Sequence, residues 1–322
     1  MNSNWKPLCS LQVLKQRAFL LSKIREYFAQ QNVLEVETPI LSSSGNTDIN
    51  ITSFTSDNIH DNCANSYLRT SPEFPLKRLL ANGSGDIYEI GKVFRREEIS
   101  RTHNTEFTML EWYRVGYNYN QLIQDVIRLF KCIFSSFEKS FEIINIITFN
   151  ELFAQFLSID VNKVSKKELN QICQKFAYSG SLLSKDESLD YLFATQIQPQ
   201  LDNGSLTFVT LYPATQAALS QINPDDSRTG LRFEVFYQGH ELGNGYQELT
   251  NGNELLERFE LDNSKRVEND KPQVTIDNYL IDAMNHGMPD CSGIAVGLDR
   301  LLMVLLDREN ISELLTFNAN NS

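Results

Sequence analysis

Hydrophobic residues recur at helical spacing in some stretches of the chain and alternate with polar residues in others. The first amphipathic stretch contains Leu11, Leu14, Ala18, Leu21, Ile24 and Phe28. Its i, i+3, i+7 spacing predicts a helix over residues 10–31. Val33–Pro39 follows as an extended segment, which Pro39 ends. A second strongly periodic stretch, from residue 122 to 137, predicts another amphipathic helix.

Alternating patterns predict the strands. We expect strands at residues 87–90 and 93–94, at 106–113 and at 232–239, and a helix that begins at residue 254. A buried strand at Gly293–Val296 turns at Gly297 into an apolar helix over residues 298–306. Residues 141–206 give weaker signals, mostly short helices with polar breaks, and show no recognisable chemistry. The pattern predicts a single domain over residues 1–322 with a helical insertion at about 141–206.

Composition narrows the class of protein. Hydrophobic residues make up 41% of the 322 and charged residues 22%, which is typical of a soluble globular protein. The formal net charge of −12 argues against a nucleic-acid partner, because binding to a phosphate backbone depends on lysine and arginine. We therefore expect no tRNA partner. Electrostatic complementarity favours a basic protein partner instead.

Cysteine usage and the distribution of apolar runs predict the cellular location. The five cysteines are Cys9, Cys63, Cys132, Cys173 and Cys291. They show no CxxC spacing, so we expect neither a disulfide framework nor a zinc site. The segment after Met1 has no apolar signal core, and the longest apolar runs are too short to span a bilayer. These features predict a cytoplasmic protein with no membrane partner.

The predicted strand at residues 106–113 has an unusual face. Strand alternation brings together Phe107, Met109, Glu111 and Tyr113. An aromatic plate, a carboxylate and a phenol are typical of a cleft that stacks a base and holds a polar ligand. A solvated face of an antiparallel sheet has a similar pattern. Arg95 on the preceding strand, and His103 and Asn104 in the connecting loop, favour the cleft.

A second cluster of candidate residues lies in a glycine-rich segment. Glu234, Glu241 and Glu248 follow one another at seven-residue spacing, with glycines at positions 239, 243 and 245. Odd spacing sends side chains to opposite faces of a regular strand, so bends at the glycines are needed to bring the carboxylates together. Gathered carboxylates repel one another unless a cation lies between them. A hard divalent cation such as Mg²⁺ is the interpretation we favour over three unrelated surface glutamates.

These segments resemble the three motifs of class II aminoacyl-tRNA synthetases, most closely those of the lysyl branch. Val33–Pro39 resembles motif 1, Phe94–Tyr113 motif 2 and Gly293–Arg300 motif 3. The resemblance covers nearly all of residues 10–310. It implies an α+β fold, the class II synthetase core, in which an antiparallel sheet is flanked by helices. It also implies a homodimer, and we expect residues 10–31 and Val33–Pro39 to form much of its interface.

The resemblance implies that the protein activates an amino acid with ATP and Mg²⁺. Negative charge builds on the α-phosphorus as the substrate carboxylate attacks, and planar arginine donors stabilise that charge. Arg95 would hold the α-phosphate and Arg300 the γ-phosphate, with Arg300 also packed against the adenine opposite Phe107. The ATP-binding residues that the resemblance implies are Arg95, Arg96, Glu97, His103, Asn104, Phe107, Glu241, Leu242, Gly297 and Arg300. As surface salt-bridge partners, Arg95 and Arg300 would be harder to explain, since a cation where Arg300 opens a helix opposes the helix dipole.

The amino-acid site follows from the same resemblance. Its residues are Ser71, Pro72, Glu73, Tyr113, Glu248 and Ala295, and the implied Mg²⁺ ligands are Glu234 and Glu241. Glu73 would pair with the substrate amine. Glu248 would hold the side-chain ammonium, with Tyr113 as its hydrogen-bonding partner. A substrate without that charge would leave both groups unpaired, so we expect a lysine-type amino acid.

Two details resemble a particular branch of the family. Only about thirty residues precede Val33, so we expect no anticodon-binding OB-fold domain. Ala295 stands where lysyl-tRNA synthetases usually have glycine, and one methyl group can shift the preferred position of the amine. Both details resemble the short paralogues of lysyl-tRNA synthetase, which pass activated β-lysine to a lysine of elongation factor P. Arg96 and Thr105 depart from the Asn and Pro usual in motif 2.

Three alternative functions stay open. A free-standing lysyl-tRNA synthetase core would act on tRNA, which the negative charge disfavours. An amide-forming enzyme of the asparagine synthetase type needs a basic pocket, whereas Glu248 and Tyr113 suit a cation. A non-catalytic amino-acid sensor is expected to have lost the motif arginines, yet Arg95 and Arg300 are both present.

Overall fold

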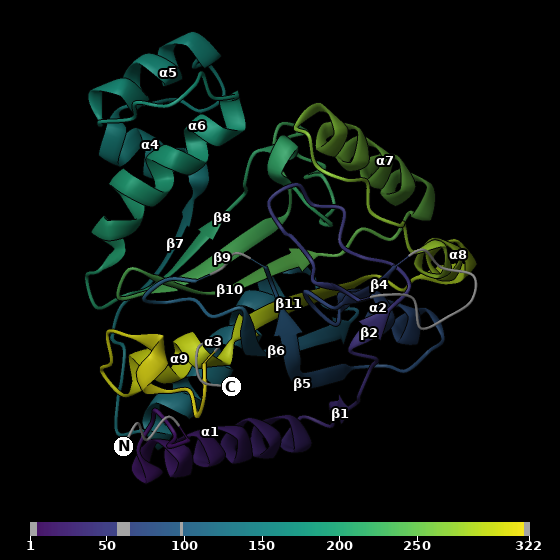
Figure 1. Cartoon of the computed structure of the whole chain (residues 1–322), viewed down its shortest axis with the longest axis vertical. Coiled ribbons are helices and arrows are strands. Elements are labelled where there is room, and N and C mark those ends of the chain that lie inside the picture. Colours follow the sequence, from purple (N-terminus) through teal and green to yellow (C-terminus); the bar gives the residue numbers. More distant parts are fainter. Residues whose placement is uncertain (1–4, 57–64, 97–98, 319–322) are drawn as a thin grey trace. The chain divides into compact units, whose positions relative to one another are not determined.

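The chain forms two compact units. A computed structural model describes residues 5–56, 65–96 and 99–318. The first unit consists of Met1–Lys139 with Glu248–Ser322, and the second of Ser140–Gln247. Figure 1 shows the helices and strands of both. Each unit is described by itself below.

Four strands form the sheet of the first unit. They are β1 (Leu34–Glu35), β5 (Ile87–Phe94), β6 (Glu106–Val115) and β11 (Cys291–Gly297). They lie in the order β1-β5-β6-β11, with β1 parallel to β5 and the other pairs antiparallel. The strands predicted from residues 87, 106 and 293 onward are confirmed. Motif 2 therefore forms two neighbouring strands, and motif 3 begins on the strand beside them.

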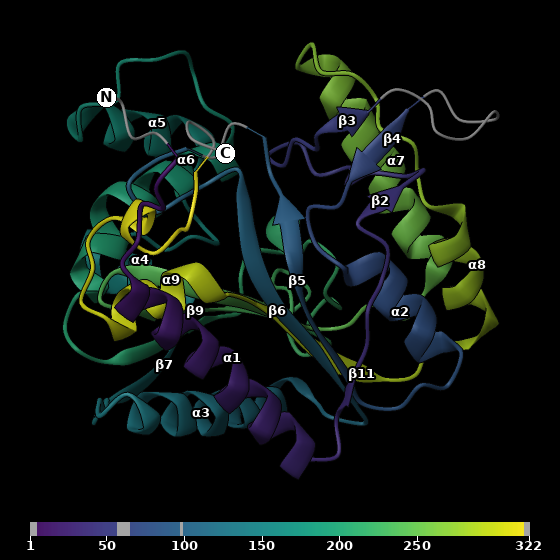
Figure 2. The ribbon, with the colours of Figure 1, turned by 60° about the horizontal axis from the view of Figure 1, so that its bottom comes forward.

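Helices α1 (Leu11–Gln30) and α3 (Tyr119–Ser136) lie side by side along this sheet (Figure 2). Phe28 of α1 stacks on Tyr88 with the ring centroids 4.4 Å apart, and its edge meets Trp112 of β6. The Trp112 indole donates a hydrogen bond to Asp125 of α3 at 3.2 Å. One face of β6 is therefore committed to the core, which leaves the other face for a site.

The predicted helix over residues 10–31 is confirmed, but its buried face differs from the predicted stripe. The buried residues of α1 are Val13, Leu20, Ile24, Tyr27 and Phe28. Leu11 and Ala18 of the predicted stripe are exposed instead. The buried apolar side chains of α1 therefore pack inside the first unit, and the dimer interface stays a prediction.

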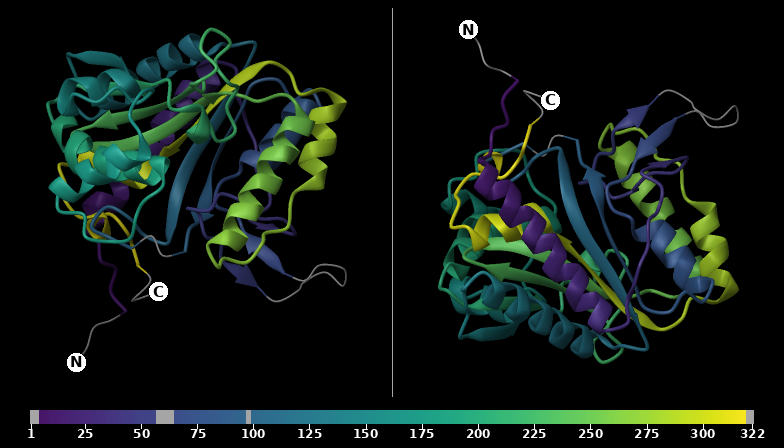
Figure 3. Two further views of the ribbon diagram at one scale, coloured as in Figure 1. Left: turned by 90° about the horizontal axis from the view of Figure 1, so that it is seen from above. Right: turned by 90° about the horizontal axis from the view of Figure 1, so that it is seen from below.

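The first unit contains further helices and short strands. They are α2 (Glu73–Ala81), α7 (Gly252–Glu268), α8 (Asn278–Gly287), α9 (Leu298–Leu305), the short strands β2 (Leu41–Ser42), β3 (Thr55–Ser56) and β4 (Ser66–Leu68), and the 3-10 turn Ile311–Glu313. The short strands form a small sheet in the order β2-β4-β3. Helices α7 and α8 run beside each other (Figure 3). The helix α9 follows β11 directly at Gly297, as predicted.

The second unit combines four strands with a group of short helices. The strands are β7 (Ile144–Thr148), β8 (Leu206–Thr210), β9 (Arg232–Tyr237) and β10 (His240–Gln247), in the order β10-β9-β8-β7. The helices are α4 (Phe149–Leu157), α5 (Lys166–Lys175), α6 (Lys185–Leu192), a π-helical turn Phe193–Ile197 and 3-10 turns at Gln198–Leu201 and Ala214–Gln216. Capping boxes begin α4, α5 and α6, each with a hydroxyl at the N-cap and a glutamate three residues on. The aromatic and aliphatic side chains of these helices pack into one core cluster around Phe153.

Within residues 5–56, 65–96 and 99–318, no helix has both the length and the apolar character needed to cross a bilayer.

Candidate active site

Helix α2 carries the amino-acid side of the predicted site. Ser71 Oγ accepts a hydrogen bond from the Glu73 N–H at 3.0 Å, and Pro72 is the N-cap residue of the helix. Glu73 and Lys77 are four residues apart, so they share one face of α2. The Lys77 ammonium lies 2.6 Å from Oε1 of Glu73 and 2.7 Å from Oε2 of Glu248. The side chains of Lys77 and Glu248 are each 1% exposed, so water does not screen this ion pair.

Strands β6 and β11 supply the rest of the pocket. Their register pairs Tyr113 with Gly293 and Glu111 with Ala295, so these four positions share one face of the sheet. Tyr113 donates a hydrogen bond to Oε1 of Glu111 at 2.7 Å, and the Ser71 hydroxyl donates to Oε2 at 2.6 Å. Glu111 and Tyr113 are each 2% exposed. The interpretation of this strand face as solvated is therefore wrong.

Glu89 is the neighbour of Glu111 on β5, directly opposite it in the strand register. Arg69 pairs with Glu89 at 2.6 Å, and the Thr38 hydroxyl donates to the same carboxylate at 2.7 Å. This pair neutralises Glu89 and ties the motif 1 segment to the sheet. The carboxylates that surround Lys77 are then Glu73, Glu111 and Glu248, which we call the carboxylate cluster.

Burial perturbs the ionisation of the carboxylate cluster. It raises the pKa of Glu111 to about 7, and the neighbouring Glu73 adds to the effect. Burial also raises the pKa of Glu248, although the Lys77 ammonium opposes the change. Burial would lower the pKa of Lys77, but Glu248 and Glu73 outweigh it, so that pKa is raised. These shifts favour the charged form of Lys77 and the protonated forms of Glu111 and Glu248.

Gly293 makes room for two of these side chains. A Cβ at this position would lie 2.4 Å from the Tyr113 ring and 2.9 Å from Oε1 of Glu248. A residue with a side chain would have to displace the phenol, the carboxylate or both. Glycine at the start of motif 3 thus allows Tyr113 and Glu248 to lie together against β11.

A cavity of about 270 Å³ opens on the α2 side of the pocket. Ser71 and Glu73 line it, together with Arg78 of α2 and Tyr279 of α8. The Arg78 guanidinium lies over the Tyr279 ring, 5.1 Å from its centroid. The cavity has room for a small polar ligand beside Glu73.

The predicted nucleotide-binding residues of the first unit gather around the loop between β5 and β6. The Arg95 guanidinium lies over the Phe107 ring, 5.3 Å from its centroid. Arg300, in the first turn of α9, donates to the Thr102 carbonyl at 3.3 Å and contacts Nε2 of His103. Arg300 and His103 are 197 residues apart in sequence, so the fold joins the predicted motif 2 and motif 3 residues.

The other predicted residues of this region either make hydrogen bonds near the loop or lie beside open space. The Asn104 amide donates to the Glu106 carbonyl at 2.7 Å. Arg96 is exposed, and its backbone N–H donates to the Thr52 carbonyl at 2.8 Å. Gly297 begins α9, and a Cβ there would meet nothing within 4 Å. Glu97 lies outside the described residues.

In the second unit, β9 and β10 bring Glu234 and Glu241 to one face. A register shift between Glu241 and Gly243 places Leu242 as an extra residue in β10. Because of this bulge, Glu241 and Asn244 both share the face of Glu234, although they are three positions apart in the strand. The bend predicted at the glycines is confirmed. Leu242 itself is buried.

The oxygen atoms on this face suit a hard cation. Glu234 accepts a hydrogen bond from Tyr212 at 2.7 Å and pairs with Arg232. Burial raises the pKa of Glu234; Arg232 opposes this change, and Glu241 adds to it. The amide oxygen of Asn244 is buried and has no hydrogen-bond partner among the described residues. Two carboxylates and an amide oxygen are donors that Mg²⁺ prefers, so these residues fit the predicted ion. In the described ranges, no group of three or more His, Cys, Asp and Glu side chains is arranged as a metal cage.

Sequence reasoning missed two features of these sites. It gave no role to Lys77 or to Asn244, and it placed Glu111 in the cleft without naming its partners. Tyr113 donates a hydrogen bond to Glu111, and Glu248 pairs with Lys77; the pairing of Tyr113 with Glu248 stays a prediction. A helix predicted from residue 73 would have placed Lys77 beside Glu73, which is the signal that could have found it.

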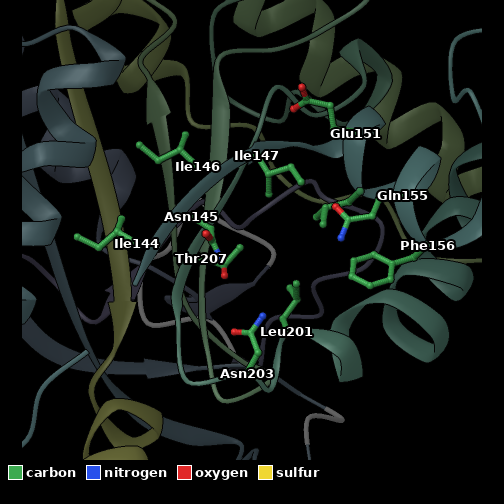
Figure 4. Close-up of a pocket in the computed structure, with 11 residues that line it drawn as sticks. Ile144, Asn145, Ile146, Ile147, Glu151, Gln155, Phe156, Leu201, Asn203 and Thr207 are labelled. Atoms are coloured by element: carbon green, nitrogen blue, oxygen red, sulfur yellow. The ribbon is translucent and has the colours of Figure 1, made fainter. Parts of the chain in front are cut away.

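A larger cavity, of about 660 Å³, lies in the second unit between β7, α4 and the segment around Asn203 (Figure 4). Its titratable residue, Glu151, accepts hydrogen bonds from the N–H and hydroxyl of Thr148 in the capping box of α4. Aliphatic and amide side chains form most of the remaining wall. The cavity around Glu73 is smaller, but Glu73, one member of the carboxylate cluster, lines it.

Comparison with known families agrees with this geometry. The sequence model of the family described as tRNA synthetases class II (D, K and N) matches residues 9–321. The chain belongs to this family, and the predicted α+β class II synthetase core is confirmed.

Three curated relatives resemble the whole chain. A protein of Buchnera aphidicola subsp. Schizaphis graminum is 41% identical, and the match covers 100% of both chains. One of Vibrio cholerae serotype O1 is 42% identical over 98% of each chain. One of Erwinia tasmaniensis is 40% identical over 99% of this chain and 98% of its own. All three are named elongation factor P–(R)-β-lysine ligase.

Proposed function

We propose that this protein is an ATP-dependent ligase that activates (R)-β-lysine as an adenylate and transfers it to a lysine side chain of elongation factor P. The names of the full-length relatives support the reaction, and the carboxylate cluster supports the class of substrate. A buried pocket with three carboxylates around a single lysine suits an amino acid that brings two further ammonium groups. This charge pattern is the observation that carries the proposal.

Activation begins with attack of the β-lysine carboxylate on the α-phosphorus of ATP. Arg95 is proposed to hold the α-phosphate and Arg300 the γ-phosphate, while Phe107 stacks on the adenine. Glu73 binds the substrate amine next to the reacting carboxylate, and Glu248 binds the ammonium at the end of the side chain. These contacts fix the carboxylate in line with the phosphorus, and the arginines stabilise the charge that develops there. Pyrophosphate then leaves.

Glu234 and Glu241 would hold Mg²⁺ in the second unit, with Asn244 as a further oxygen donor. The ion would neutralise charge on the ATP phosphates. In the second half-reaction, the neutral amine of the acceptor lysine attacks the acyl carbon of the adenylate. The new C–N bond forms the amide as the acyl C–O bond breaks, AMP leaves with that electron pair, and the amine releases a proton to water.

We also propose that the protein forms a homodimer and works in the cytoplasm without tRNA. Leu11 and Phe19 of α1, together with Leu34, are exposed apolar residues in the segments predicted for the interface, and exposed Ile40 follows the second segment directly. The net charge of −12 opposes a tRNA acceptor. A free-standing synthetase core that acts on tRNA is the second candidate function, because the matched family is described as tRNA synthetases.

Transfer to the two acceptors separates the candidates. The purified protein is incubated with ATP, Mg²⁺ and (R)-β-lysine, and with either elongation factor P or lysine tRNA. We expect intact-mass spectrometry to show one added β-lysyl group on elongation factor P, and none when its acceptor lysine is replaced by arginine. Acylation of tRNA with unmodified elongation factor P would contradict the proposal and support the second candidate.

A further inference from the structure

Lys77 occupies an unusual position for a lysine. Its side chain is fully buried, and its ammonium contacts Glu73 and Glu248 at 2.6 and 2.7 Å. Burying an ammonium is costly unless it is paired and hydrogen-bonded, so the two carboxylates must compensate for it. The substrate assignments implied by the family give roles to both carboxylates but none to the lysine between them.

We propose that Lys77 is a positioning residue of the amino-acid pocket, which sets the charge of the carboxylate cluster to match a substrate with two ammonium groups. The inference rests on the proposed function, that a lysine-type amino acid binds here. Lys77 acts through Glu73 and Glu248, which it holds by one oxygen each.

The charges of the four groups support this role. Glu73, Glu111 and Glu248 surround one ammonium, which leaves a formal charge of −2 when all four are ionised. Two substrate ammonium groups neutralise that charge. Glu89, the remaining carboxylate on the same sheet face, is already neutralised by Arg69. Without Lys77 the cluster would carry −3, which buried carboxylates avoid by taking up protons.

The geometry supports it as well. Lys77 contacts Oε2 of Glu248, and the other oxygen, Oε1, lies on the side of Gly293 and Tyr113. One oxygen is thus held by the protein while the other borders the substrate side of β11. The same ammonium fixes Glu73 on the adjacent turn of α2. Lys77 therefore sets the spacing of the two carboxylates that receive the substrate.

Lys77→Met tests the proposal, because methionine has a similar length and no charge. We expect the KM for β-lysine in pyrophosphate exchange at pH 7 to rise ~30-fold or more, with the KM for ATP changed by about twofold at most. In this variant the KM for β-lysine should fall as the pH rises. The carboxylates hold more protons than in the wild type, which the substrate must displace, and a higher pH removes them. Calorimetry in buffers of different ionisation enthalpy should show more protons released per β-lysine bound than in the wild type. Lys131→Met, at an exposed position on α3, is the matched control and should leave all these quantities unchanged.

A charge rescue separates this role from simple packing. Lys77→Met with Glu111→Gln returns the cluster to a formal charge of −2, so the double variant should bind β-lysine more tightly than Lys77→Met. If Lys77 is only a packing residue, the second substitution removes further contacts and binding weakens again. That result, or an unchanged KM and proton release in Lys77→Met, would overturn the proposal. If Lys77→Met does not fold, Lys77→Met with Glu111→Gln is compared with Glu111→Gln alone. Equal numbers of protons released per β-lysine bound by these two variants would overturn the proposal.

The ligand-free protein gives a readout that is independent of the proposed function. The stability of the wild-type protein is expected to fall as the pH rises to about 7. In Lys77→Met this fall should continue above pH 7, as measured by thermal unfolding. An unchanged pH profile would reject the role of Lys77 whatever the substrate is. A wild-type protein that activates no lysine isomer would instead reject the proposed function, while the pH profile would still decide whether Lys77 sets the charge of the cluster.

Discussion

The Tyr113 hydroxyl donates a 2.7 Å hydrogen bond to Glu111, and both side chains are 2% exposed on the same face of β6. This bond stabilises the ionised form of Glu111, as does the bond from Ser71, but burial outweighs both and raises the pKa of the carboxyl to about 7. Glu111 is therefore poised to release a proton when a cation enters the pocket.

Stability and binding should depend on pH in opposite directions. Glu111 titrates near its ordinary value of 4.5 in the unfolded chain and near 7 in the folded protein. The folded state binds the proton more tightly, so the contribution of Glu111 to the free energy of unfolding is lost as the pH rises from about 4.5 to 7. The loss is on the order of 3 kcal/mol for this group. Thermal unfolding of the ligand-free protein should show a fall in stability across this range.

Affinity for β-lysine should increase over the same range, because ionised Glu111 adds a charge to the pocket. Calorimetry from pH 6 to 8 measures it directly. Glu111→Gln is the matched variant and should flatten both profiles. A wild-type affinity that stays constant from pH 6 to 8 would contradict this account of Glu111.

The motif arginines should be needed for activation. Arg95→Ala and Arg300→Ala each remove a charged donor at the phosphates, and we expect each to lower the rate of pyrophosphate exchange by about 10²–10³-fold. Arg101→Ala is the control, since Arg101 lies in the same loop and pairs with Glu309 at an exposed position. Near-normal exchange by Arg95→Ala or Arg300→Ala would remove that residue from the proposed reaction.

Gly293 should be intolerant of a side chain. In Gly293→Ala the new Cβ would lie 2.4 Å from the Tyr113 ring, so the ring or β11 must move. We expect a lower melting temperature and at least a ~10-fold higher KM for β-lysine, as for other overpacked sites. Gly297→Ala offers a comparison on the same strand, because its Cβ meets nothing within 4 Å and its melting temperature should not change. Equal melting temperatures for the two variants would show that Tyr113 is not held as described.

Ala295 should affect the placement of the amine and leave the charge of the pocket unchanged. It lies opposite Glu111 in the strand register and adds one methyl group to the pocket. Ala295→Gly should leave the KM for ATP unchanged and relax discrimination between β-lysine and α-lysine, by about 1–3 kcal/mol at most. The ratio of kcat/KM for the two isomers is the measurement. An unchanged ratio would show that Ala295 does not set amine position.

The long periodic segments of the fold could be predicted from the sequence. The helix over residues 10–31, the strand from residue 106 and the strand-to-helix turn at Gly297 all follow from local spacing. The face that α1 buries could not be predicted in the same way. Val13 and Leu20 are buried while Leu11 and Ala18 are not, because packing against α3 and the sheet decides among neighbouring apolar stripes.

The candidate site could be predicted only in part, because packing between distant segments also decides which side chains become partners. Strand alternation indicated Glu111 and Tyr113, the spacing of three carboxylates indicated Glu248, and Glu73 followed from the resemblance to the family. Lys77 was missed because α2 is short, carries a proline in its first turn and shows no extended periodicity. The pairing of Tyr113 with Glu111, and of Glu248 with Lys77, depends on contacts between segments far apart in sequence. Local pattern cannot choose among such partners.

The negative charge of Glu248 is proposed to select the side-chain ammonium of the substrate, and Glu248→Gln tests this role. Glutamine keeps the shape of the side chain and removes its charge. We expect wild-type protein to support pyrophosphate exchange with (R)-β-lysine, and Glu248→Gln to lose it by orders of magnitude while still binding ATP in calorimetry. Exchange by Glu248→Gln at the wild-type rate and KM would contradict the assignment of the pocket.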